Sequence, residues 1–337
     1  MDIMVLDKNF NILGVLDNYD SIVWNRKYYE TGSFTIQTAK FDFTGAKYIW
    51  SKDLDETGIV QTIDRKTNTS TSTIVSGKFL EETLENLCIH TTEQYTGYGV
   101  NIVKTIMAKY YPDITIAETT LTGNYISTSF TGETIGEAIR KILEPNEMSF
   151  KLTLDYQTNG ITFTVYQGTD RTQSQDVNAW AVFGTDNETI LSNEYKYDDS
   201  TYKNYAVVAG EGEGAERTIV IVDNRTDTTE EIKELYVDAN DLTSADITQE
   251  VYLENLKQRG LEKLQDYKLI QKVDFSVDTT SVLEYHTNYD LGDKVTYKET
   301  NGYLENRITE ITYSIEGGNT IIDVTFGNTY NLKGVFN

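Results

Sequence analysis

The feature that most constrains the fold is a succession of short alternating segments separated by tight-turn sequences. The chain contains 24 tyrosines and only two prolines, Pro112 and Pro145. Tyrosine and the abundant threonine are favoured on strand faces that are partly exposed to solvent. Asn-Gly or Gly-Gly between alternating segments is typical of hairpins. Turn sequences of this kind are Lys8-Asn9, Thr158-Asn159-Gly160 and Gly317-Gly318-Asn319. The pattern predicts a predominantly β protein with many antiparallel neighbours.

Helical periodicity divides the chain into three expected parts. Residues 1–88 read as consecutive strands, ending in a short helical face formed by Leu80, Leu84 and Leu87. Residues 89–185 add two helices, which stop at Pro112 and Pro145, to further strands. Residues 186–337 return to strands around a long helix over 246–268. The predicted fold class is α+β, predominantly β: two β-rich blocks bracket an α+β insertion, and their strand spacing fits small antiparallel β-barrel or sandwich domains.

The long helix carries its own start and packing signals. Asp246 is expected to be the N-cap, with Gln249 three residues later completing a capping box. Val251, Leu256, Leu261, Leu264 and Tyr267 are expected to share its buried face. Gly260 in the helix interior costs about 1 kcal/mol relative to alanine, which indicates close packing against another element.

Charge and length exclude some classes of protein. The 337 residues contain 29 Lys plus Arg and 53 Asp plus Glu, so the net charge is −24. Such a surface repels nucleic acid and anionic membranes, which suits either plain solubility or a lumen that DNA passes without binding. The start MDIMVLDKNF is not a signal peptide, and no apolar stretch reaches the ~18 residues of a membrane span. We expect synthesis in a cytoplasm, no membrane anchor, and roughly 14,000 Å² of exposed surface when folded.

Residues suited to nucleophilic or histidine-based catalysis are scarce. His90 and His286 are the only histidines, and the chain has no HExxH, CxxC or GxSxG sequence. Cys88, the single cysteine, is expected to be a small buried apolar residue. The glycine-rich sequence Gly210–Gly214 lacks the Lys-Ser/Thr of a phosphate loop and contains two glutamates, so a hairpin loop explains it better.

Carboxylates leave an enzymatic alternative open. A glycosidase needs two carboxyl groups roughly 5–10 Å apart in an aromatic cleft. Adjacent acidic pairs occur at Asp198-Asp199, Glu81-Glu82 and Glu230-Glu231, but neighbouring side chains point apart. The oxygen-rich segments 223–231 and 238–246 lack the glycine and final glutamate of a calcium loop, and solvated turns are the favoured interpretation. No catalytic, cofactor-binding or metal residue is therefore predicted, and no cofactor.

Tyrosines gather in clusters that suit an interface. The clusters are Tyr28-Tyr29, Tyr95-Tyr98, Tyr110-Tyr111 and Tyr195-Tyr197-Tyr202-Tyr205. Tyr195 and Tyr197 share one face of a strand and would form a stripe. Subunit contact is the first interpretation, because a tyrosine ring buries area while its hydroxyl tolerates water. Sugar binding and the covering of a barrel stay open.

Four sequence segments, in the order in which they occur along the chain, resemble the tail-hub family of bacteriophages. The first runs from Tyr19 to Ile36, and the others are VYQGTDRT (165–172), NYAVVAGEGEGAER (204–217) and LEYHTNYDLGDKVTY (283–297). The residues that carry the resemblance are Trp24, Arg26, Tyr28, Gly32 and Phe34, the turn Gly168–Thr172, and Leu291, Gly292, Asp293 and Val295. The similarity extends to siphophage tail-hub-like proteins, to the hub region of tail-associated proteins and to contractile-phage baseplate hubs.

The resemblance implies a structural virion protein and not an enzyme. Family members are typically homotrimers whose two barrels per chain form a pseudo-sixfold ring that closes the tail tube and adapts sixfold to threefold symmetry. Implied partners are the tail tube or distal tail protein, the tape measure protein and a spike or fibre, with DNA passing an acidic bore without specific binding. The implied location is the tail tip or baseplate of a phage, prophage or bacteriocin particle made in the bacterial cytoplasm. Because the sequence ends at Asn337, any cell-wall hydrolase is expected to be a separate protein.

Two rival functions remain. One is a tail-associated carbohydrate-active or peptidoglycan-degrading enzyme, which an acidic pair in an aromatic cleft would favour. The other is a monomeric surface-binding module. A rim with sheet edges available for ring closure would favour the hub.

Overall fold

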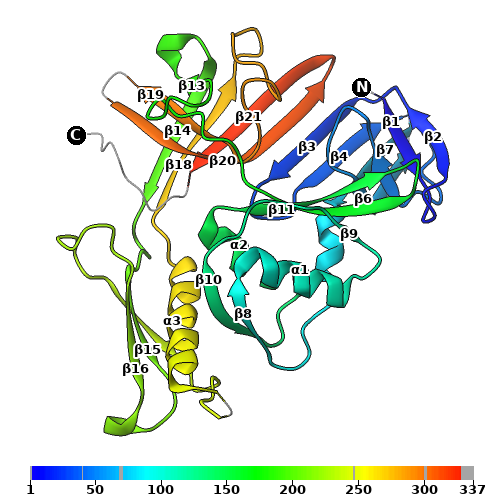
Figure 1. Ribbon diagram of the computed structural model, residues 1–337. Helices are drawn as coiled ribbons and strands as arrows, with labels where there is room; N and C mark the ends of the chain where they lie inside the picture. Colours follow the sequence, from blue (N-terminus) through cyan, green and yellow to red (C-terminus); the bar gives the residue numbers. More distant parts are fainter. Residues whose placement is uncertain (1, 40, 68–70, 246, 300–301, 328–337) are drawn as a thin grey trace.

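The computed structural model describes residues 2–39, 41–67, 71–245, 247–299 and 302–327, and it is mostly β (Figure 1). The helices in this part of the chain are α1 (Gly99–Tyr110), α2 (Ile135–Leu143) and α3 (Gln249–Gln265), with short 3₁₀ turns such as η1 (Leu80–Glu85). The strands are β1 (Ile3–Leu6), β2 (Ile12–Leu16), β3 (Ser21–Lys27), β4 (Ser33–Thr38), β5 (Tyr48–Trp50), β6 (Gly58–Thr67), β7 (Thr71–Phe79), β8 (Glu93–Tyr98), β9 (Thr115–Ile116), β10 (Tyr125–Phe130), β11 (Ser149–Asp155), β12 (Gly160–Tyr166), β13 (Val182–Phe183), β14 (Ile190–Asp198), β15 (Tyr205–Ala209), β16 (Ile219–Asp223), β17 (Glu234–Asp238), β18 (Ile270–Val277), β19 (Lys294–Glu299), β20 (Gly302–Glu316) and β21 (Asn319–Gly327).

One large sheet joins the first and last parts of the chain. Its strand order is β14-β18-β21-β20-β3-β4-β7-β6-β5-β1-β2, with β19 also paired to β20 and β13 to β19. The decisive link is β3 with β20, which run antiparallel from Lys27 opposite Glu310 to Ser21 opposite Glu316. The two predicted small barrels are thus fused into a single sheet, and the strands of the described residues trace no closed barrel. Sequence patterns specify strands and turns but not which distant edges pair.

Two halves of this sheet have the same strand plan. In one direction along the sheet, the first half runs β6-β7-β4-β3 and the second half continues as β20-β21-β18-β14. In both halves the first strand in sequence pairs with the second, the second with the fourth, and the fourth with the third. Both also carry a bulge on the third strand, at Val60/Thr62 and at Ile308/Glu310.

Alternation gives the joined halves one buried face and one open face. Trp24, Phe34 and Ile322 lie on the buried face and belong to two apolar cores. The open face carries small polar residues, and one row crosses six strands through Ser33, Asn25, Thr312, Asp323, Ser276 and Ser192. Its charged residues are Lys27, Lys66, Lys78, Lys196 and Lys272, together with Asp64, Glu194, Asp198, Asp274, Glu310, Glu316 and Asp323. Both signs are therefore nearly balanced here, in contrast to the acidic chain as a whole.

The middle of the chain forms a separate layer below the sheet in Figure 1. Helices α1 and α2 pack together over the hairpin β11–β12, and their buried residues share one core with Leu80 and Leu84. Thr134 caps α2 through a complete capping box with Glu137. The hairpin turn places Asn159 at φ +57°, as the Asn-Gly sequence predicts. The proposed division of the chain at residues 88 and 185 stays a prediction.

A lobe built on α3 lies at the lower left of Figure 1 and contacts β10 of the middle layer, where the Ser127 hydroxyl donates to Asn255 Oδ1 at 3.1 Å. It contains the sheet β16-β15-β17, whose inner face packs on α3 through Ala206, Val208 and Leu256. A Cβ on Gly260 would lie 2.7 Å from side-chain carbons of Val208 and Val222, so the expected close packing is confirmed. The loop of residues 210–218 joins β15 to β16, which confirms the hairpin interpretation of the glycine-rich sequence.

Several sequence-based expectations are wrong in detail. The α3 helix starts later than predicted, because the Thr248 side chain accepts a hydrogen bond from the Val251 amide; Asp246 lies outside the described residues. Leu80 and Leu84 are buried on a 3₁₀ turn, while Leu87 is 42% exposed because this turn ends at Glu85. Cys88 is exposed, since it lies in an isolated bridge to Thr134 at the rim of the middle layer.

The surface area also departs from the expectation. The chain exposes 17,275 Å², against roughly 14,000 Å² for a compact chain of this mass. No helix in the described part of the chain has the length and apolar character of a membrane span.

Candidate functional site

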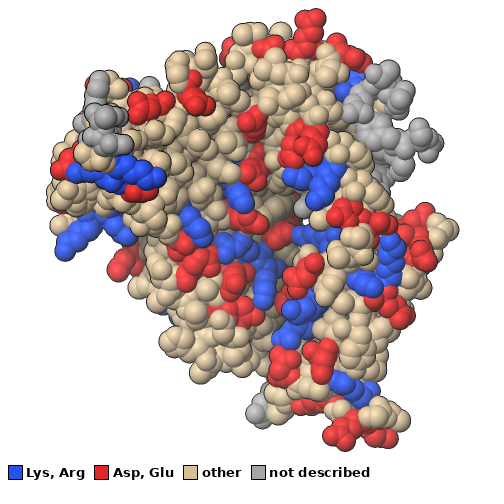
Figure 2. Space-filling view, turned by 180° about the vertical axis from the view of Figure 1, so that it is seen from behind, with Lys and Arg blue, Asp and Glu red and all other residues tan. Residues whose placement is uncertain are grey.

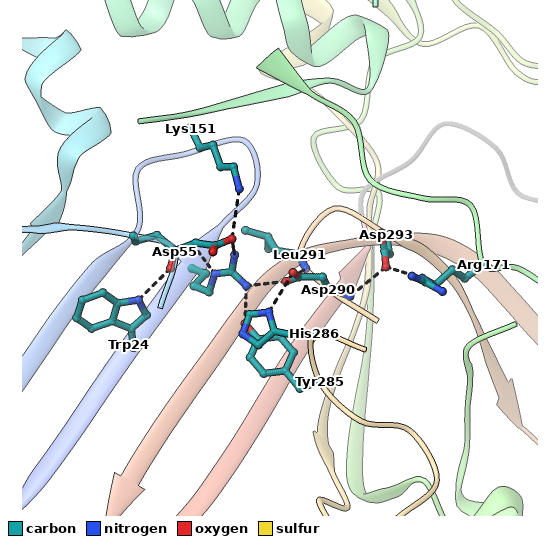
Figure 3. Close-up of polar contacts among 11 residues, drawn as sticks. Trp24, Asp55, Lys151, Arg171, Tyr285, His286, Asp290, Leu291 and Asp293 are labelled. Carbon is teal, nitrogen blue, oxygen red and sulfur yellow. Dashed lines mark hydrogen bonds and ion pairs between the residues drawn. The ribbon is translucent and has the colours of Figure 1, made fainter. Parts of the chain in front are cut away.

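Three of the four sequence segments singled out above meet at one place, which we call the junction; the segment 204–217 lies in the α3 lobe instead. The junction is formed by Arg26 of β3, the segment 55–56 before β6, residues 166–171 after β12, and the loop 285–293 before β19. A cavity of about 300 Å³ lies between them. Figure 3 shows the contacts that join these segments, which come from all three parts of the chain.

Arg26 is the centre of the junction. Its side chain is only 6% exposed, and its guanidinium donates to Glu56 Oε1 at 2.5 Å, to Asp290 Oδ1 at 2.6 Å and to the Tyr285 hydroxyl at 2.5 Å. Trp24 Nε1 donates to the other oxygen of Glu56 at 3.1 Å. A buried cation with this many acceptors is well compensated, so the network fixes three segments relative to one another.

Asp290 is held ionised by its neighbours. Burial favours its neutral form, but the hydrogen bond with His286 Nδ1 (3.1 Å) and the charge of Arg26 outweigh burial and hold the pKa of Asp290 well below its usual range. The Leu291 amide also donates to Asp290 Oδ1 at 2.6 Å. His286 has φ +65°, a conformation stabilised here by the tight loop. Its ring therefore serves to position a carboxylate.

Asp293 links the late loop to the turn Gly168–Thr172. Its Oδ1 accepts from the Thr169 amide at 2.7 Å, and its Oδ2 accepts from Arg171 Nε at 2.9 Å. The Asp290 amide donates to the same Oδ2 at 3.0 Å. The turn Gly168–Thr172 and the turn Leu291–Asp293 are thus two halves of one contact, although they belong to separate segments of the sequence.

Tyr28 and Arg307 support this contact from the inside. The Tyr28 hydroxyl donates to the Glu147 carbonyl at 3.0 Å, and the Arg307 guanidinium carbon lies 5.2 Å from the Tyr28 ring centroid. Arg307 is almost fully buried; it donates to the Gly292 carbonyl and, at 3.0 Å, to Glu147 Oε2. Burial raises the pKa of Tyr28 to about 12, so its hydroxyl stays protonated and donates.

Glu81 is the junction residue that sequence reasoning missed. It is buried at the start of η1, and its Oε1 accepts from the Leu152 amide at 2.8 Å. Burial raises its pKa to about 7, and the nearby charge of Glu56 acts in the same direction. The sequence analysis named it only as half of the adjacent acidic pair Glu81-Glu82, and its position beside Leu80 and Leu84 was the only signal of burial.

The other sequence candidates lie elsewhere. His90 is exposed at the rim of the middle layer, whereas His286 belongs to the junction loop. Asp198 and Asp199 lie at the exposed end of β14, and Glu230 accepts from Tyr202 at 3.0 Å. Of the oxygen-rich segments, the first is occupied by Arg225, which donates to both oxygens of Asp223. Within the described residues no group of three or more metal-ligating side chains is present.

The tyrosine clusters lie in different environments. Tyr28 and Tyr29 are packed in the core, with their rings 4.7 Å apart. Tyr110 donates to Glu93 and Tyr111 to the Thr83 carbonyl. Tyr195 and Tyr197 are 41% and 53% exposed on β14, so the predicted stripe exists at a sheet edge.

The ion pairs of the junction hold the three parts of the chain together. Three acidic side chains of the junction are paired with cations: Glu56 and Asp290 contact Arg26, and Asp293 contacts Arg171. Asp55 bridges Arg26 and Lys151, at 3.8 and 3.2 Å. Carboxylates in such ion pairs are poor proton donors and nucleophiles. Removing these ion pairs would instead uncouple the three parts of the chain.

Residues 2–328 match the family described as Siphovirus ReqiPepy6 Gp37-like protein. The chain belongs to this family. No curated protein sequence matches it.

Three solved structures with the same fold are described as tail proteins. A tail protein from Neisseria meningitidis MC58 has a TM-score of 0.63 at 13% identity and covers 97% of this chain and 96% of its own. The 43 kDa tail protein of prophage MuSo2 from Shewanella oneidensis has a TM-score of 0.63 at 12% identity, over 97% and 98%. Prophage tail protein gp18 from Listeria monocytogenes EGD-e has a TM-score of 0.58 at 14% identity, over 98% and 95%. The fold of this Gp37-like chain is therefore shared with these proteins from end to end.

Proposed function

We propose that this Gp37-like chain is a structural tail protein of a phage or prophage-derived particle, and that it acts as the hub at the tip of the tail tube. The observation that carries the proposal is the joined sheet, in which two halves with one strand plan present a continuous polar face across eight strands. End-to-end similarity to tail proteins supports the same assignment.

The repeated half explains how such a chain adapts symmetry. Three copies carry six equivalent halves, so a threefold ring offers a hexameric tube six similar positions. The ring would present the spike or fibre with threefold symmetry on its other side. The distal tail or tube protein and the tape measure protein are the other partners this position implies.

The bore of the ring is assigned to the open face of the joined sheet. Hydroxyl and amide side chains dominate the row through Ser33, Asn25 and Thr312, and charges of both signs flank it. Such a wall offers DNA few unpaired cations, and phosphate contacts are the main source of non-specific binding. The family resemblance implied an acidic wall; the wall proposed here is polar and close to neutral. Seen from behind, basic and acidic side chains are likewise interspersed around a central hollow (Figure 2).

The enzyme alternative has one observation in its favour. Glu81 is a partly protonated carboxyl near neutral pH and lines the junction cavity together with Phe79, Phe150 and Tyr166. However, Glu81 already accepts the Leu152 amide, and Glu56, which raises its pKa, is bound to Arg26 and Trp24. We therefore rank a structural role above catalysis.

The mass of the protein in solution tests the hub proposal. Light scattering across a concentration series is expected to give about three times 38.3 kDa for the chain alone. With the tail tube protein of the same particle it is expected to give the mass of this trimer plus that of the bound tube protein. Electron microscopy of the same sample is expected to show rings with a bore. A chain that stays monomeric under both conditions would contradict the hub, and degradation of peptidoglycan by the purified monomer would establish the alternative.

A further inference from the structure

Besides the end strand β2, two strands of the large sheet have long segments without a neighbour on one side, within the described residues. Strand β14 ends the sheet, and Leu191–Tyr197 are exposed on both faces. Strand β6 pairs with β5 only near Gly58 and Ile59, and Gln61–Thr67 run past it, exposed on both faces. In the described part of the chain, no strand covers either outer side. Long uncovered edges are normally blunted or paired, so a partner strand is expected at both.

The repeated strand plan relates these two strands, β14 and β6, to β3 and β20, which pair with each other inside the chain. In the repeated plan, β14 occupies the position of β3, because Tyr195 opposite Val273 corresponds to Trp24 opposite Phe34. Likewise β6 occupies the position of β20, since Thr62 and Glu310 both follow the bulge. Inside the chain β3 pairs with β20. The equivalent pair joins β14 to β6. Because β14 and β6 lie at opposite ends of the joined halves, the β6 that pairs with β14 must belong to a second copy.

We infer that β14 of one copy pairs antiparallel with β6 of the next copy, in the register that β3 and β20 use within the chain. Lys27 lies opposite Glu310, Asn25 opposite Thr312 and Val23 opposite Ser314. Transferred to the edges, this register sets Lys196 opposite Asp64 of the next copy, and Glu194 opposite Lys66 of the next copy. Strand positions alone define this register, without reference to charge.

The charges then match at both positions on the open face. Opposite charges directly across an antiparallel pair stabilise it, and a one-step slip would move them to opposite faces. On the other face, Tyr197 meets Ile63 of the next copy, and these side chains are 53% and 45% exposed in the single chain. Tyr195 meets Arg65 of the next copy, a suitable cation–π partner. Arg65 contacts Asp42 at 2.8 Å and Lys66 lies 3.7 Å from Asp64 within the chain, so these exposed pairs exchange partners on assembly.

This contact is head-to-tail and closes a ring only if its rotation does so. The inference specifies how copies of the proposed hub contact one another. It rests on the hub proposal for the number of copies, because six equivalent halves require three copies. It assigns the Tyr195–Tyr197 stripe to a subunit interface, and it makes the polar open face continuous around the bore.

Disulfide trapping tests the pairing in the full chain with Cys88→Ser as background, because Cys88 is exposed. Cysteines at Asp64 and Lys196 in the same chain are expected to give covalent dimers and trimers on oxidation, with the ladder ending at trimer, since directly opposed strand residues have Cβ atoms within disulfide reach. Two matched controls carry Lys196→Cys with Val15→Cys, on the other sheet edge β2, and Glu194→Cys with Thr62→Cys, which is out of register.

Charge exchange provides a second readout that does not depend on cysteine chemistry. Lys196→Glu and Asp64→Lys are each expected to abolish the trimer at a concentration where the parent is trimeric, while the double variant restores it. Restoration would show that the single variants fold.

The outcomes separate the inference from the hub itself. Trimers that cross-link through Val15, or that ignore both charge reversals, overturn the β14–β6 pairing and leave the hub standing. A parent that never assembles and never cross-links overturns both. Cross-linking confined to the 64–196 pair, together with charge rescue, supports the pairing.

Discussion

Gly168 and Gly292 meet backbone to backbone at the junction. A Cβ on Gly168 would lie 1.9 Å from the Gly292 carbonyl oxygen, and a Cβ on Gly292, whose φ is +90°, would lie 2.3 Å from the Tyr28 ring. The Gly292 carbonyl also accepts a hydrogen bond from Arg307. Both glycines are required by close approach, so three parts of the chain interlock through positions without side chains.

Gly168→Ala is expected to destabilise the protein by about 2 kcal/mol or more, because the clash involves backbone atoms that cannot rotate away. Chemical denaturation monitored by fluorescence measures the change in the free energy of unfolding. Gly160→Ala is the matched control, since its new Cβ would meet only the Thr158 hydroxyl, at 3.1 Å. Equal losses in the two variants would contradict the interlock.

Arg26→Met is expected to cost about 3–5 kcal/mol, because it leaves Glu56 and Asp290 without their cation in a largely buried site. The same measurement on Lys104→Met serves as control. Lys104 pairs with Glu118, which is 96% exposed, and such surface pairs contribute about 0–1 kcal/mol. A small loss in Arg26→Met would show that the junction is not held by this network.

Local sequence signals predicted the parts of this fold that depend on neighbours in the chain. Hairpin turns at Asn159 and at Gly317-Gly318 follow from residues that adopt positive φ, and Gly260 predicted close helix packing. The joining of β3 to β20 could not be predicted, because an edge pair between remote strands leaves no pattern in either strand alone. Without it, two similar sets of strands suggested two separate barrels.

From the sequence, the residues of the junction could be named only as members of separate segments. Arg26, Gly168 and Asp293 were each singled out, but the hydrogen bonds that unite them span all three parts of the chain. Cys88 is exposed, against the expectation, and Glu81 is buried, because the turn at η1 is 3₁₀ and ends at Glu85. A helical-wheel argument fails when the turn has a different period.

Glu81 is expected to make the protein less stable as the pH rises. Its pKa of about 7 in the folded protein lies above the ordinary glutamate value of 4.5, so the folded state holds a proton that the unfolded state releases. The destabilisation is absent below pH 4.5, grows through the window between the two values, and is complete above pH 7. A tenfold difference in proton affinity corresponds to about 1.4 kcal/mol, so the full loss of folding free energy is on the order of 3 kcal/mol.

Glu81→Gln is expected to remove this dependence, because its amide oxygen can still accept the Leu152 amide without titrating. Denaturation curves at about pH 5 and about pH 8, on either side of most of this window, compare the two proteins, with an expected gain for the variant only at the higher pH. Glu82→Gln, whose side chain pairs with Lys78 at the surface, is the matched control. An unchanged pH dependence in Glu81→Gln would assign the effect to other groups.

Gly260→Ala tests whether the α3 lobe is held by close helix–sheet packing. In an exposed helix this substitution stabilises by about 1 kcal/mol, but here the methyl group would lie 2.7 Å from Val208 and Val222. Overpacking of this kind costs about 1–3 kcal/mol, so a net loss is expected. Hydrogen exchange should localise the change, with faster exchange in β15 and β16 and unchanged exchange in β3 and β20. Lys257→Ala, on the exposed side of the same helix, should leave both regions as they are. Faster exchange throughout the joined sheet would mean that the lobe and the sheet unfold as one unit.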